Sequence, residues 1–196
     1  MKKFLWIAAS FCIFATASAQ HPHWGIKGGL NVANLNVQHG AELDYKLGVH
    51  IGGLAHIHLS DHFALQPELM YSNQGGEQNS GSTEYKTKLH YVNLPVLLQF
   101  MTGSGFRLQT GPQVGALLSA KSKVNDVEVE VDDNYKTPDF SWSFGASYVT
   151  MKGFGVDARY NHGISNINDA PGNKYKNRVF QFGVFYQFRV SEYRRK

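Results

Sequence analysis

The chain has 196 residues, of which 42% are hydrophobic and one is a cysteine, and its formal net charge is +4. The length fits one domain behind a short leader, and the excess of positive charge lies at the two ends, because residues 20–188 carry 13 basic and 14 acidic groups. These values exclude a disulfide framework, an iron–sulfur cluster and a basic body that would bind nucleic acid.

The first 19 residues have the three parts of a secretory signal peptide. Two lysines precede an apolar run over residues 4–14, and small residues lead to Ala19. The apolar run is shorter than the ~20 residues that a membrane-spanning helix needs, so we expect cleavage after Ala19 and assign residues 1–19 to the signal peptide. Cys12 lies within the signal, which leaves the mature chain without a thiol.

Eight segments after the signal alternate apolar and polar residues, which is typical of strands with one face in each environment. In the last segment Phe180 and Phe182 share one face, whereas Gln181 and Gln187 share the other. Each segment provides the ~9–11 residues of a tilted membrane strand. In chain order the segments are 24–33, 45–60, 62–72, 88–102, 106–120, 141–151, 154–165 and 178–188.

Short and long connections alternate strictly between these segments. Residues 60–61, 103–105 and 152–153 form tight turns, and residues 34–44, 73–87, 121–140 and 166–177 form long polar loops. Bacterial outer-membrane barrels have this topology, with periplasmic turns and long extracellular loops. We therefore predict an all-β fold, an eight-stranded antiparallel up-and-down transmembrane β-barrel over residues 20–188, with a basic C-terminal tail at residues 189–196.

Side-chain size indicates which face looks outward. An eight-stranded barrel has an interior barely wide enough for its own side chains, so the bulky apolar face belongs outside and the glycine-rich polar face inside. A soluble lipocalin-like barrel would reverse this. The expected lipid-facing set forms two aromatic girdles, one of Trp24, Phe63, Phe106 and Phe154 at the periplasmic ends and one of Tyr45, Tyr71, Trp142 and Phe180 at the extracellular ends.

Three prolines lie inside the predicted strands, at Pro67, Pro95 and Pro112. Each removes a donor from the hydrogen-bond ladder where a closed barrel has no free edge. We expect bulges or local distortion at these positions.

Several stretches resemble one known family. They are GIKGGLN at 25–31, LQPELMY at 65–71, VNLP at 92–95, GPQVG at 111–115 and DARYNHG at 157–163. Together they resemble the PorT-like outer-membrane β-barrel family of Bacteroidetes over nearly the whole mature chain. The resemblance implies an outer-membrane barrel in the cell envelope. It also implies that the three prolines within strands are a regular feature of the family. It implies no activity, since most members have none established, and the chain departs from the usual end on the last aromatic residue because eight residues follow Phe188.

The predicted lumen mixes opposite charges. We expect a closed polar plug in which Glu68 and Asp157 pair with Lys27, Arg107 or Arg159, because buried charges must be compensated; the alternative is a conduction path or a binding pocket. The full predicted lumen set is Lys27, Asn31, His50, His56, His58, Gln66, Glu68, Asn93, Gln99, Arg107, Gln109, Gln113, Asp157, Arg159, Asn161, Gln181 and Gln187.

Histidines on one strand raise the question of a metal. His56 and His58 share a face with His50, and His62 follows the turn, so two imidazoles could share a transition metal. Metal sites usually need three or four ligands, and we expect hydrogen bonding instead. The sequence therefore predicts no metal, no cofactor and no catalytic residue.

Two loop features complete the candidates. Residues 124–133 alternate valine with acidic residues, which favours a β-hairpin above the membrane over a calcium or partner-binding loop, since the glycine and ligand spacing of a calcium loop are missing. A membrane enzyme could use His162 with Asp169 or His90 with Glu84, but neither pair has a recognisable catalytic motif.

The sequence thus predicts a non-enzymatic integral barrel in contact with outer-membrane lipids, whose loops bind an extracellular or envelope protein partner or surface, or which stabilises the envelope. The alternatives are a barrel enzyme acting on envelope lipid or peptide, a soluble lipocalin-like carrier and a pore. Nucleic acid is not an expected partner.

Overall fold

The computed structural model of the chain describes residues 22–37, 44–80, 83–124, 127–131, 137–168 and 174–188. The predicted signal peptide and tail therefore lie outside the described residues. In the described part no helix is long and apolar enough to cross a membrane. The strands are β1 (His23–Val37), β2 (Lys46–His58), β3 (Phe63–Ser80), β4 (Thr83–Met101), β5 (Phe106–Val124), β6 (Val127–Glu130), β7 (Asp139–Val149), β8 (Phe154–Gly163) and β9 (Tyr175–Gln187).

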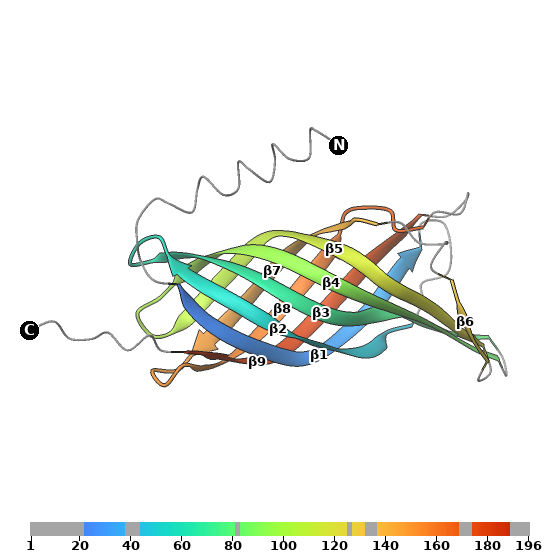
Figure 1. The fold of residues 1–196 in the computed structure, drawn as a ribbon, viewed down its shortest axis with the longest axis horizontal. Coiled ribbons are helices and arrows are strands. Elements are labelled where there is room, and N and C mark those ends of the chain that lie inside the picture. Colours follow the sequence, from blue (N-terminus) through green and yellow to red (C-terminus); the bar gives the residue numbers. More distant parts are fainter. Residues whose placement is uncertain are drawn as a thin grey trace, which may run out of the picture.

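Eight of the described strands close into an antiparallel barrel, which confirms the predicted fold (Figure 1). The sheet order is β4-β3-β2-β1-β9-β8-β7-β5, and a further pairing between β4 and β5 joins its two ends. β6 pairs only with the far part of β5, beyond the stretch that β7 covers. It is therefore an added hairpin strand and takes no part in closing the barrel.

Short turns join strands at one end of the barrel, here called the turn end, and the opposite end is called the loop end (Figure 1). Two of the short turns repeat the same geometry. The Thr102 amide donates to the Phe106 carbonyl at 2.9 Å, and the Thr150 amide donates to the Phe154 carbonyl at 2.7 Å. Gly105 and Gly153 have φ of 91° and 90° at equivalent places, a conformation that favours glycine.

The strands are longer at the loop end than the sequence predicted. Residues 73–87 were expected to be a polar loop, yet β3 runs to Ser80 and β4 starts at Thr83, and the two remain paired throughout. β5 likewise continues to Val124 and forms a hairpin with β6, as expected for that segment. A strand with water on both sides needs no apolar alternation, so its sequence looks like a loop.

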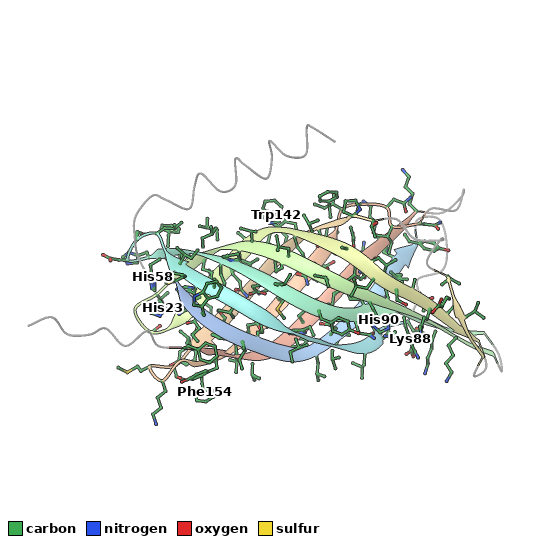
Figure 2. The ribbon with its side chains drawn as sticks, in the orientation of Figure 1. His23, His58, Lys88, His90, Trp142 and Phe154 are labelled. Atoms are coloured by element: carbon green, nitrogen blue, oxygen red, sulfur yellow. The ribbon has the colours of Figure 1, made fainter. Side chains whose placement is uncertain are left out.

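The faces are arranged as predicted. Trp24, Phe63, Trp142 and Phe154 point away from the barrel and are exposed, and the polar alternation points inward. Figure 2 shows Trp142 and Phe154 projecting from the outside of the ribbon, with Phe154 nearer the turn end. The apolar outer face excludes the lipocalin-like arrangement, which needs that face inside.

The prolines distort pairing without shifting it. The β3–β4 ladder skips the residues between the Pro67–Val96 and Met70–Asn93 pairs, and register is unchanged on either side. The expectation of bulges or local distortion at the prolines is therefore confirmed in the form of local distortion. The register shift of the β4–β5 pair lies between His90 and Tyr91, where the strands leave the regular barrel and continue into the loop-end extension.

Candidate functional site

The barrel lumen holds the polar residues that the sequence placed there. All of the predicted set are buried except His58, which is half-buried at the turn end. Their hydrogen bonds arrange them in layers from the turn end to the loop end, and each layer joins side chains from strands far apart in sequence.

Four charged side chains form the central layer. The Arg159 guanidinium donates from both Nη atoms to the two Glu68 carboxylate oxygens, at 2.9 and 2.8 Å. Lys27 Nζ lies 2.6 Å from Asp157 Oδ2 and 3.8 Å from Glu68 Oε1. Two cations and two anions thus balance, as buried charges require. We call Lys27, Glu68, Asp157 and Arg159 the charged quartet; of the three expected cations, Arg107 is not part of it.

An amide and hydroxyl chain lies above the quartet. Asn31 Oδ1 accepts a hydrogen bond from Gln181 Nε2 at 3.0 Å and lies 2.8 Å from His50 Nδ1. Asn161 Nδ2 donates to Gln181 Oε1 at 2.9 Å, and Ser143 Oγ donates to Asn161 Oδ1 at 2.7 Å. His50 therefore belongs to a hydrogen-bonded layer, as expected for a lumen histidine.

Arg107 and histidines gather at the turn end of the lumen. Arg107 Nη2 donates to Gln187 Oε1 at 3.2 Å. The His58 ring lies 4.6 Å from that of His56 and 5.5 Å from that of His23, between centroids, and Figure 2 shows His23 and His58 together at this end. Sequence reasoning missed His23, although the β1–β2 register pairs it with His56.

The described residues contain no group of three or more His, Cys, Asp and Glu side chains arranged to hold a metal. His62 follows the strand that carries His56 and His58, but its ring stacks on Phe100 on the outside of the barrel, at 6.2 Å between ring centroids. A recess of about 470 Å³ opens beside the turns, between Arg107 and Tyr148. Its walls combine turn residues such as Thr102 and Met151 with the strand residues His58 and Arg107, and the acidic residue among them is Asp61.

An apolar cluster closes the lumen at the loop end, and the sequence did not predict it. Its buried members are Leu35, Leu89, Tyr91, Ala120 and Ile167. The signal was present, because Leu35 continues the inward alternation of β1 and Leu89 that of β4. The cluster was missed because Leu35 and Ile167 lie in residues 34–44 and 166–177, which the sequence pattern assigns to loops.

The two histidines that the sequence offers as candidate catalytic residues each contact a tyrosine. His90 Nδ1 lies 2.6 Å from the Tyr71 hydroxyl, and His162 Nδ1 lies 3.3 Å from the Tyr160 hydroxyl. The Glu84 side chain and Asp169, their proposed partners, lie outside the described residues. Neither enzyme candidate is therefore assembled in the described part of the chain.

Lysines cluster on one outward face of the loop-end extension. The β4–β5 register sets Lys86 opposite Lys123 and Lys88 opposite Lys121. Lys86 Nζ lies 3.9 Å from Glu77 Oε1, and Lys121 pairs in register with Glu130 on β6. We call these four lysines the lysine face; Figure 2 shows Lys88 beside His90 near the loop end.

Solved structures of small outer-membrane barrels resemble this fold. Neisserial surface protein A matches with a TM-score of 0.60 and 17% identity, covering 84% of this chain and 97% of its own. Ail, the attachment invasion locus protein of Yersinia pestis, matches with a TM-score of 0.55 and 14% identity, covering 86% of this chain and 100% of its own. At such identities the likeness concerns the fold alone.

No curated protein matches this chain. A family model described as "Outer membrane protein beta-barrel domain" matches residues 18–169. The match spans most of the barrel, and it agrees with the closed eight-stranded sheet, the apolar outer face and the compensated polar lumen described above. The chain therefore belongs to the outer-membrane β-barrel domain family and resides in the outer membrane.

Proposed function

We propose that this barrel neither conducts nor catalyses, and that it displays its loop-end extension outside the cell as a binding surface for an extracellular or envelope protein partner. The observation that carries the proposal is the paired extension itself. β3 continues from Tyr71, in the predicted outer girdle, to Ser80, which is ~30 Å along the strand at about 3.3 Å per residue. A barrel that served only as a membrane plug would not need a sheet of this length.

The lumen supports a closed barrel. The charged quartet lies across its centre with side chains at most 2% exposed, and the apolar cluster around Tyr91 lies above it. An ion crossing the lumen would have to separate the Arg159–Glu68 pair, and breaking a buried pair typically costs about 3–5 kcal/mol. This supports the plug over the pore. The lack of a recognisable catalytic motif around His90 and His162 in the sequence supports the non-enzymatic function over a lipid- or peptide-modifying enzyme.

The lysine face indicates the chemistry of the partner. The four lysines lie together on this face, with Glu77, Glu128 and Glu130 beside them in register. Basic groups gathered on one outward surface attract a partner that presents acidic groups. Ail has been solved in complex with the heparin analogue sucrose octasulfate, a precedent for anion binding on the same fold.

The experiment uses site-specific photo-crosslinking on intact cells. A photoreactive amino acid at Val129, exposed on β6 (55%), should give one protein adduct, and replacing Lys121 and Lys123 by glutamine should reduce that adduct. The matched control is the same probe at Val184, exposed on the lipid-facing wall. Absence of an adduct at Val129, or an adduct that the lysine replacements leave unchanged, would contradict the proposal.

The narrower family and the processing are part of the same proposal. The motifs listed above support placement with the PorT-like barrels of Bacteroidetes, without a role in protein secretion. Cleavage after Ala19 and a basic periplasmic tail at residues 189–196 fit a barrel whose described ends, at His23 and Gln187, both lie at the turn end. Amino-terminal sequencing of the mature protein tests the cleavage; a sequence that starts at Met1 contradicts it.

A further inference from the structure

The start of β9 carries a column of basic side chains on the outside of the barrel. Lys176 and Arg178 alternate with the inward residues Asn177 and Val179, which are buried, and the exposed Lys174 directly precedes the strand. They therefore share the outward face of Phe180, which is exposed below them. This column is separate from the lysine face, because β9 lies between β8 and β1.

The column begins at the edge of the membrane. Arg178 is ten positions along β9 from Phe188, the last aromatic residue at the turn end. At about 3.3 Å per residue and a tilt near 45°, this separation is roughly 23 Å across the membrane, close to the ~25 Å of an outer-membrane apolar band. Arg178 thus lies at the depth of the lipid headgroups, and Lys176 and Lys174 lie just beyond.

The neighbours of Arg178 in register are polar side chains other than carboxylates. In register it stands beside His162 of β8 and Asn34 of β1, and His162 stands beside Trp142 of β7, which Figure 2 shows pointing away from the barrel. Below them Tyr160 and Phe180 pack with ring centroids 4.7 Å apart. Aromatic rings on the membrane side, with polar side chains directly beyond them toward the loop end, are typical of the membrane–water interface.

No carboxylate opposes this charge on the surrounding strands. β1 and β9 contain no acidic residue, and the acidic residues of β7 and β8, Asp139 and Asp157, are buried on the lumen side. Among the described residues, the Arg178 Nε is buried and has no hydrogen-bond partner. A buried donor without a partner is costly, and in the described part of the chain this arginine nitrogen lacks an acceptor of the kind that a phosphate oxygen provides.

We propose that Arg178 and Lys176, with Lys174 above them, bind the phosphate of an anionic lipid headgroup in the outer leaflet. Arginine suits a phosphate because its planar fork donates two hydrogen bonds to one group. The depth favours a lipid phosphate over a soluble polyanion, which would meet the loop-end tip first. This site does not depend on the partner-binding function proposed above.

The test is native mass spectrometry of the folded full-length mature protein in neutral detergent, titrated with diphosphoryl lipid A. Replacement of both Lys176 and Arg178 by glutamine should weaken lipid A binding at least tenfold. The control, Lys152→Gln at the exposed turn end, removes a positive charge away from the column and should change binding less than twofold. A heat-modifiable band on gels verifies that each variant is folded.

Three results would overturn the proposal. The first is equal loss of binding in the control and in the Lys176/Arg178 variant, which indicates unspecific charge attraction. The second is unchanged binding in the Lys176/Arg178 variant. The third is complete displacement of lipid A by millimolar inorganic phosphate, which makes the site one for a free anion. The single variant Arg178→Lys should still bind lipid A, with an affinity reduced a few-fold, because lysine keeps the charge and loses the planar fork of arginine. That result supports the proposal.

Discussion

Replacing the arginine of the charged quartet should lower the free energy of unfolding more than a substitution at an exposed position. In Arg159→Met the Glu68 carboxylate loses two hydrogen bonds of 2.8 and 2.9 Å and retains Gln66 Nε2 at 2.8 Å and Lys27 Nζ at 3.8 Å. Leaving one partner of a buried pair uncompensated costs about 3–5 kcal/mol. We expect the free energy of unfolding to fall by that amount.

The measurement is equilibrium unfolding in urea of protein refolded into phospholipid vesicles, followed by tryptophan fluorescence. The double variant Glu68→Gln with Arg159→Met removes both charges and leaves the 2.6 Å Lys27–Asp157 pair, so it should be more stable than the single Arg159→Met variant. Lys152→Met, at an exposed turn, is the control and should change stability by less than about 0.5 kcal/mol. A loss under about 1 kcal/mol in Arg159→Met, or a double variant as unstable as the sum of its parts, would refute the reasoning.

Three further predictions address the walls and ends of the barrel. Gly29→Ala should prevent or strongly impair folding, because the added Cβ would lie 2.1 Å from the Phe182 carbonyl oxygen. In Gly28→Ala the nearest atom to the added Cβ is 3.6 Å away, so this control should fold normally. Heat-modifiability on gels measures folding of both variants, and equal behaviour of the two contradicts the packing argument. Burial raises the pKa of Asp139, which lies beyond Trp142 at the loop end, from 3.8 to about 6, so its contribution to stability is full below pH 3.8 and is lost as pH rises through 6. Urea unfolding midpoints should show this pH dependence, on the order of 2–3 kcal/mol. Asp139→Asn should abolish the pH dependence, and an identical pH profile in the variant argues against it. With Trp24 or Trp142 as the single remaining tryptophan of the mature chain, fluorescence should be quenched more by lipids brominated near the headgroup than near the chain end, and the reverse order would move that residue out of its girdle.

The barrel itself could be predicted from the sequence because its two faces meet different environments. Phe180 and Phe182 face lipid and Gln181 faces the lumen, so period-two alternation is strong wherever a strand crosses the membrane. The narrow lumen added a second signal in side-chain size. Together these also fixed the lumen set, including the pairing of Glu68 with a cation from a strand far away in the chain.

The loop-end extension could not be predicted in the same way. Residues 73–87 do not alternate apolar and polar side chains: Gln74 is polar although it is buried, and Glu77 and Lys86 pair across the two strands. Only the pairing of β3 with β4 reveals it, and pairing depends on the partner strand as much as on the sequence. The choice of Arg159 over Arg107 as the partner of Glu68 had the same origin, because it depends on register around the barrel.

The charge distribution places specificity on the outside of this protein. In the lumen the charged quartet is balanced internally, and its cations and anions are already committed to one another. On the outside, the lysine face and the Arg178 column concentrate positive charge at two separate places on the loop end. An internally balanced lumen stabilises one closed barrel, whereas positive charge clustered on the outside attracts anionic groups. We therefore expect changes at Lys121 or Arg178 to alter what the barrel binds without unfolding it, and changes at Glu68 or Arg159 to lower its stability.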